Sequence, residues 1–192
     1  MKRSLSIILM AILVLLSGCS GGDIPDKLDY EIEAFEFTNQ DGETVSLEDL
    51  KGKVWVADFV FTSCDDVCLP MTFNMSKIQD LVKEEGLENV EFVSFSVDPE
   101  VDQPQVLKEF GEKFGADFAN WNFLTGYSQD KIELFARESF TTLVVKPEEG
   151  DQVAHGTSFY LVDQTGTVVK DYSGVTDVPY ETIIEHIKIL QQ

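Results

Sequence analysis

The stretch VWVADFVFTSCDDVCLPMT, residues 54–72, joins a predicted strand to a predicted helix through a pair of cysteines. Its first eight residues are nearly all apolar, which is typical of a strand buried on both faces of a sheet. After the cysteines, apolar residues recur at helical spacing from Met71 to Val82, and Gly86 is a natural stop for that helix. VEFVSFSV, residues 90–97, predicts a second buried strand. This order predicts a parallel pair joined by a right-handed crossover.

The flanking segments complete an α/β fold. Asp41-Gly42 within FEFTNQDGETVSL predicts an N-terminal hairpin, and SFYLVD and TVVKDY around residues 164–166 predict a late one. Helices are expected over about 104–114, over 128–138 with Ser128 as N-cap, and in YETIIEHIKIL near the end. The economical arrangement is a thioredoxin-like fold, with a central mixed sheet flanked by helices. The cysteines then follow a central strand, where open α/β sheets build their sites.

The N-terminal residues predict export. Lys2 and Arg3 precede LSIILMAILVLL, an apolar run too short for a comfortable membrane span of roughly 20 residues. The run closes on LSGC, which resembles the bacterial lipobox and implies a diacylated Cys19. We therefore expect a signal peptide (1–18), a lipidated cysteine with its tether (19–30) and one domain (31–192). Two acyl chains suffice to hold that domain on the extracytoplasmic face of a bacterial cell membrane.

The acidic composition limits the partners. The chain has 192 residues, enough for one sizeable core, and a net charge of −21. Binding to phosphate groups needs clustered Lys and Arg, so nucleic acid is excluded as a partner. The charge mainly predicts solubility, and attraction of cations or of a basic protein is the alternative.

Cys64 and Cys68 are the cysteines that remain once Cys19 carries lipid. A structural disulfide across so short a loop would stabilise the fold very little. The spacing alone leaves a redox dithiol and a metal site open. Asp65 and Asp66 should raise the pKa of both thiols, which favours holding a cation, whereas a helix N-terminus acts in the opposite direction. Pro70 lacks an N–H and is tolerated only in the first helical turn, and Leu69 before it is biased away from helical angles. We therefore expect Cys68 at the start of the helix and Cys64 on an exposed loop before it.

Other candidate residues are weaker. His155 in GDQVAHGTSF precedes a strand, and by itself a loop histidine is usually incidental. His186 is expected to be a solvated residue of the last helix. Met71 and Met75 lie on the apolar helix stripe and are expected in the core. Asp58 lies within an apolar strand, so it is either paired or has a raised pKa, and it could transfer protons to the thiols.

Three motifs in order resemble the Sco/SenC family of copper-binding, thioredoxin-fold proteins. FVFTSCDDVCLPMT matches the family pattern F-x-F-T-x-C-x-x-x-C-P, apart from Leu69 where proline is usual. SFSVDPEVDQP, residues 94–104, matches S-V-D-P-x-x-D-x-P, and His155 precedes SFYLVD as the family histidine precedes its strand. The resemblance covers residues 31–190.

The resemblance implies a metal site and a partner. Cys64, Cys68 and His155 would bind one copper ion, Cu(I) or Cu(II), and the two cysteines would form a redox-active disulfide in the oxidised apo form. Asp98 would be an outer-sphere or loop-organising residue. The implied function is assembly of the CuA centre in subunit II of cytochrome c oxidase, by a metallochaperone and not an enzyme.

Other functions compatible with this fold are kept as alternatives. The main one is a thiol–disulfide oxidoreductase that keeps the CuA-site cysteines of subunit II reduced, and a copper-sensing redox switch also stays open. A thiol peroxidase is disfavoured because it needs an arginine beside its reactive cysteine. Arg137 is the only arginine besides Arg3, and it is far from Cys64 along the chain.

Overall fold

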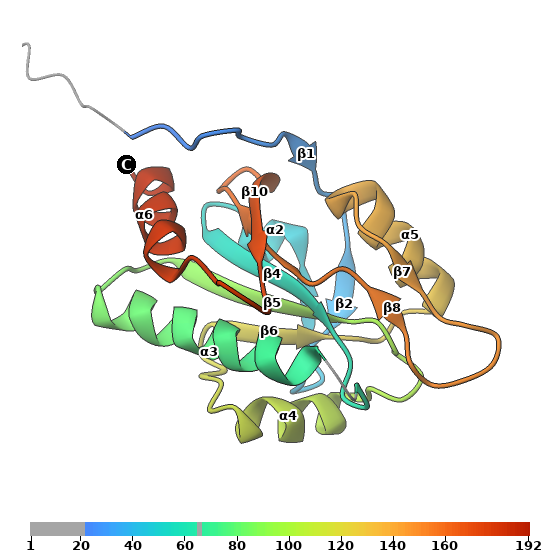
Figure 1. The fold of residues 1–192 in the computed structure, drawn as a ribbon. Helices are drawn as coiled ribbons and strands as arrows, with labels where there is room; N and C mark the ends of the chain where they lie inside the picture. Colours follow the sequence, from blue (N-terminus) through green and yellow to red (C-terminus); the bar gives the residue numbers. More distant parts are fainter. Residues whose placement is uncertain (1–21, 65–66) are drawn as a thin grey trace, which may run out of the picture.

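A six-stranded mixed sheet forms the centre of the molecule, in the order β1-β10-β9-β4-β5-β6 (Figure 1). The computed structural model describes residues 22–64 and 67–192, so the predicted signal peptide, Cys19 and Asp65-Asp66 lie outside the described residues. The strands of this sheet are β1 (Tyr30–Glu31), β4 (Val54–Val60), β5 (Val90–Ser96), β6 (Trp121–Leu124), β9 (Ser158–Val162) and β10 (Thr167–Ser173). The predicted α/β class with a central mixed sheet is confirmed.

The parallel half of the sheet consists of β4, β5 and β6. β4 and β5 pair in parallel register from Val54↔Val90 to Val60↔Ser96. The helix α3 (Cys68–Glu84) joins them, as the sequence predicts. β6, which pairs in parallel with β5, was not predicted, because four residues between two helices give too little pattern. The carboxyl ends of all three strands meet at one edge of the sheet, where open α/β folds place their sites.

Helices cover both faces of this sheet (Figure 1). Besides α3, the part of the chain that the structure describes contains the helices α2 (Leu47–Leu50), α4 (Pro104–Lys113), α5 (Gln129–Phe140) and α6 (Tyr180–Leu190). Ser128 caps α5 as predicted, because its side chain accepts a hydrogen bond from the Lys131 N–H. Within the described residues, we find no helix with the length and apolarity needed to cross a membrane.

The core has two layers because side chains alternate along β4. Trp55 and Phe59 pack with the apolar residues of α5, whereas Val56 and Val60 pack with those of α3, α4 and α6. Met71 and Met75 are fully buried in the second layer. Their predicted place in the core is confirmed.

Both predicted hairpins are present. β2 (Glu36–Thr38) and β3 (Thr44–Ser46) pair around Gly42, whose φ of +79° suits glycine, and β9 and β10 form the late hairpin. A third antiparallel pair, β7 (Val144–Val145) with β8 (Ala154–His155), was not predicted. Strands of two residues are too short to show any alternation.

His186 is buried, so its predicted solvated position is wrong. Only 6% of this residue is exposed. Its Nδ1 lies 2.7 Å from the Tyr172 hydroxyl on β10. α6 packs on the sheet along a stripe wide enough to include position 186, and Tyr172 supplies the polar partner that a buried imidazole needs.

Candidate metal centre

Cys64 and Cys68 lie between the end of β4 and the start of α3. The Cys64 N–H donates to the Phe61 carbonyl oxygen at 3.4 Å, closing a turn directly after the strand. α3 begins at Cys68, whose N–H donates to Cys64 Sγ at 3.4 Å. Pro70 occupies the first helical turn, where its missing N–H has no helical partner to lose. The predicted location of Cys68 at the helix start is confirmed.

The two thiols are buried, contrary to the exposed loop expected from the sequence. Cys64 is 8% exposed and Cys68 is fully buried. The reason is local: Phe61 and Val67 pack with both cysteines in the core layer that faces α5. An ion bound between these sulfurs would be largely shielded from water.

His155 reaches the cysteines from the β7–β8 hairpin. Its Nδ1 lies 2.8 Å from the Gly156 carbonyl oxygen, which can only accept, so Nδ1 carries the proton. The lone pair of Nε2 is therefore directed toward Cys68 Sγ, 3.3 Å away. Gly156, the next residue, lies close against Thr142, because a Cβ there would lie 2.1 Å from Thr142 Oγ1.

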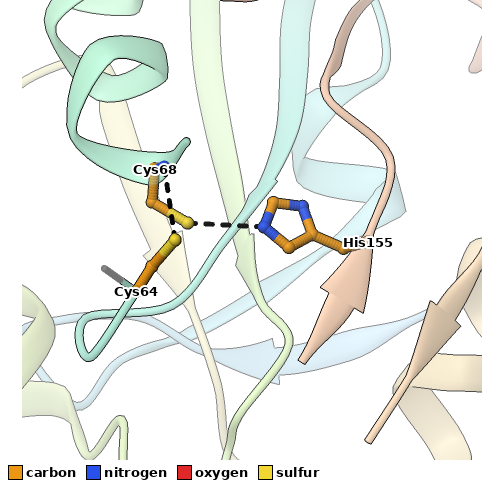
Figure 2. A group of neighbouring side chains, drawn as sticks. All are labelled: Cys64, Cys68 and His155. Atoms are coloured by element: carbon orange, nitrogen blue, oxygen red, sulfur yellow. Dashed lines mark hydrogen bonds between the residues drawn. The ribbon is translucent and has the colours of Figure 1, made fainter. Parts of the chain in front are cut away.

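The three side chains form one compact group (Figure 2). Their ligand atoms, two sulfurs and one nitrogen, all lie within 4.8 Å of one another. Thiolates and imidazole together suit soft or borderline ions such as copper and zinc. The structure thus brings Cys64 and Cys68 together with His155, although 87 positions separate Cys68 from His155 in the sequence.

Burial favours the neutral forms of Cys68 and His155 while no cation is bound. It raises the pKa of the Cys68 thiol, and it lowers the pKa of His155. Metal binding requires thiolate sulfur and neutral imidazole, so a bound cation would release the Cys68 proton while His155 already has the form needed. The donor set fits a soft cation.

Asp98, the predicted outer-sphere residue, lies near the site without joining the three-residue group. It is 1% exposed, and its carboxylate accepts a hydrogen bond from Lys146 Nζ at 2.8 Å. Sequence reasoning missed a second carboxylate, Asp102, which is fully buried and bonded to Thr62. The signal was available, since Asp102 is the second aspartate of SVDPEVDQP.

Asp58 is a buried carboxyl, and neither of its oxygen atoms has a hydrogen-bond partner within residues 22–64 and 67–192. Burial raises its pKa to about 7, and the nearby Ser94 hydroxyl offsets this rise in part. Of the two predicted possibilities, pairing or a raised pKa, the structure supports the second. A negative charge on Asp58 would further raise the pKa of Cys68.

The chain matches the model of the SCO1/SenC family over residues 25–192. It is 52% identical over 177 residues to the SCO1 protein homolog of Bacillus subtilis, covering 92% of this chain and 91% of that protein. A SCO1/SenC family lipoprotein from Bacillus anthracis has a similar crystal structure, with 55% identity and a TM-score of 0.85 over 88% of this chain and 100% of that one.

Two further solved structures concern the chemistry of their own sites. BsSco, a member of the Sco family of cytochrome c oxidase assembly proteins with an identified disulfide switch, is 53% identical, with a TM-score of 0.81 over 88% of this chain and 97% of that one. ScoI of Bradyrhizobium japonicum, solved with copper bound, is 26% identical, with a TM-score of 0.68 over 83% of this chain and 99% of that one. Taken with the family match, these similarities show that the chain belongs to the SCO1/SenC family.

Proposed function

We propose that this protein is a copper-binding assembly factor for the CuA centre in subunit II of cytochrome c oxidase. The observation that carries the proposal is the group formed by Cys64, Cys68 and His155, whose ligand atoms lie within 4.8 Å of one another. One copper ion per domain would bind there. Copper in ScoI of B. japonicum and the assembly role of BsSco support this choice of ion and process.

The protein would act by ligand exchange and not by turnover. Copper is then its cargo: thiolates of the partner would replace Cys64 and Cys68 as ligands. The Gly156 carbonyl keeps the His155 proton on Nδ1, so Nε2 stays available as a ligand throughout. Both cysteines are buried, so the transfer would require a partner to gain access to sulfur atoms that are largely shielded in this structure.

We place this function on the extracytoplasmic face of a bacterial cell membrane. Residues 1–18 would be removed as a signal peptide, and Cys19 would carry the lipid that anchors residues 31–192 through a short tether. The lipoprotein from B. anthracis supports the anchor. Such an anchor would confine the search for a partner to the membrane surface.

A second candidate is a thiol–disulfide oxidoreductase that keeps the subunit II cysteines reduced. The disulfide switch of BsSco and the direct Cys68 N–H to Cys64 Sγ contact favour it. In that reaction the two thiols would pass two electrons and two protons to a partner disulfide. The products would be a Cys64–Cys68 disulfide and a partner dithiol.

A copper titration of the reduced protein separates the two candidates. We expect one equivalent of Cu(II) to bind, with thiolate charge-transfer bands that change in Cys64→Ser, Cys68→Ser and His155→Ala. His186→Gln is the matched control, since it alters the other histidine, and should bind like the parent. Binding that is indifferent to His155→Ala, together with fast dithiol exchange with an oxidised acceptor, would refute the copper proposal and favour the reductase.

A further inference from the structure

The segment from Ser96 to Asp102, here called the 96–102 turn, is itself tightly folded. Its first residue is the last of β5, and the rest of the turn leaves the carboxyl end of that strand. The ribbon of this part of the chain is shown in Figure 1. The Asp98 carbonyl accepts hydrogen bonds from the N–H groups of Val101, at 3.1 Å, and Asp102, at 2.9 Å. Ser96 Oγ accepts from the Asp98 N–H at 3.1 Å. The two aspartates of this turn are therefore held at fixed places relative to β5.

Asp102 connects the turn to the cysteine loop. Its Oδ1 accepts hydrogen bonds from the Thr62 N–H at 3.2 Å and from the Thr62 hydroxyl at 2.6 Å. Its Oδ2 accepts from the Ser96 hydroxyl at 2.6 Å. Thr62 is two residues before Cys64, and Asp102 is fully buried, so water does not compete for these charged hydrogen bonds. The start of the cysteine loop is thereby fixed to the turn.

Asp98 connects the same turn to the hairpin that carries His155. Its carboxylate accepts from Lys146 Nζ at 2.8 Å, and Glu100 accepts from the same ammonium at 2.9 Å. Lys146 directly follows β7, and Val144 of β7 is the register partner of His155. Asp98 thus acts on the position of His155 in two steps: its ion pair with Lys146 holds the end of β7, and β7 pairs with the strand that carries His155.

We propose that Asp102 and Asp98 are positioning residues that together set the separation between the dithiol and His155. Asp102 acts through Thr62 and Asp98 acts through Lys146, and a turn of seven residues joins the two. The inference rests on the proposed function for the identity of the ion. Its first test needs no metal, so the failure of this inference can be told apart from the failure of the proposed function.

The test uses the full chain, purified in detergent, in parent form and with Thr62→Val, Thr62→Ser, Lys146→Gln and Tyr172→Phe. Thr62→Val removes the hydroxyl bond to Asp102 but keeps the backbone bond, so it perturbs folding less than removing the buried carboxylate. Tyr172→Phe is the control, since it loses a buried 2.7 Å hydrogen bond between β10 and α6, which carry no site residue. The first readout is the metal-free equilibrium with glutathione disulfide. There the Cys64 and Cys68 thiols lose two electrons and two protons, forming their S–S bond and two glutathione thiols.

Thr62→Val should lower the equilibrium constant for the Cys64–Cys68 disulfide roughly tenfold, because losing the hydroxyl bond to Asp102 loosens the start of the cysteine loop and lowers the effective concentration of one thiol at the other. Thr62→Ser should restore it, and Lys146→Gln and Tyr172→Phe should leave it unchanged. The second readout is Cu(II) affinity, which should fall roughly tenfold in Lys146→Gln, as for other outer-shell partners of metal ligands.

Each contrary result overturns a defined part of the proposal. If the equilibrium constant for the Cys64–Cys68 disulfide were the same in Thr62→Val as in Tyr172→Phe, the role of Asp102 would be overturned. Unchanged copper affinity in Lys146→Gln, or a shifted disulfide equilibrium there, would overturn the role of Asp98. Absence of copper binding by the parent would refute the proposed function and the copper-dependent role of Asp98, while the glutathione equilibrium would still decide the role of Asp102.

Discussion

Replacing Asp58 by Asn should change how the stability of the domain depends on pH. An ordinary Asp carboxyl has a pKa of 3.8, whereas burial raises the pKa of Asp58 to about 7. Between these values the folded protein holds a proton that the unfolded chain has released. Stability therefore falls as pH rises from about 4 to about 7, by about 4 kcal/mol in total at 1.36 kcal/mol per pH unit.

Asn has nearly the shape of Asp but carries no charge, so Asp58→Asn removes this titration. The variant should have stability close to the parent near pH 4, and should exceed it by up to about 4 kcal/mol above pH 8. The free energy of unfolding is measured by urea denaturation of the reduced, metal-free protein at intervals from pH 4 to pH 8.5. Asp80→Asn, at an exposed position on α3, is the control and should follow the parent curve.

Two results would contradict this reasoning. Parallel curves for Asp58→Asn and the parent would show that the folded domain ionises Asp58 without cost. A variant less stable than the parent above pH 8 would show that the charge has a compensating partner. The raised pKa of Asp58 originates in burial, which the Ser94 hydroxyl offsets only in part, so either outcome would disprove that account.

Three further changes test other parts of the structure. Gly156→Ala should lower stability by about 1–3 kcal/mol and weaken metal binding, because the new methyl group would overlap Thr142 Oγ1, and adding Thr142→Ala should restore part of both losses. Calorimetry and metal titration of the single and double variants measure this coupling. Ser128→Ala should cost about 1 kcal/mol in urea denaturation through loss of the α5 N-cap, with an unchanged copper spectrum. Burial lowers the pKa of His186 below its ordinary value of 6.5, so the parent should lose stability as the pH falls below about 6.5. Glutamine takes up no proton there, so the free energy of unfolding of His186→Gln should fall less over the same pH range. Denaturation curves of the two proteins that stay parallel from pH 7.5 to pH 5 would contradict this.

The elements that could be predicted are those with long, uniform burial. β4 and β5 are buried on both faces over seven residues each, which leaves a continuous apolar run in the sequence. β6 has four residues, and β7 and β8 have two each, so they show no periodicity and depend on the sheet or hairpin beside them. His186 was misjudged for a related reason: its burial depends on Tyr172, which approaches from another strand.

The cysteine pair could be found locally, whereas its histidine could not. Cys64 and Cys68 are four residues apart, but His155 lies 87 residues beyond Cys68 and has no local feature of a ligand. Only the resemblance to the Sco/SenC motifs singled it out. Asp102 was missed because its partner Thr62 is 40 residues away, so the bond between them exists only after β4 and β5 have paired.

The sheet order explains why these distant residues meet. β4 and β5 are parallel neighbours, so the segments that follow them, with Cys64 and Asp102, emerge at the same edge. β9 is the antiparallel neighbour of β4, with Ala57 opposite Tyr160, so the residues that precede β9 reach that edge as well. His155 lies three residues before β9 begins, and it arrives there from the opposite chain direction. The candidate metal centre is thus a consequence of strand order. Short-range patterns could identify its cysteine pair, but they could not identify its histidine or bring the three residues together.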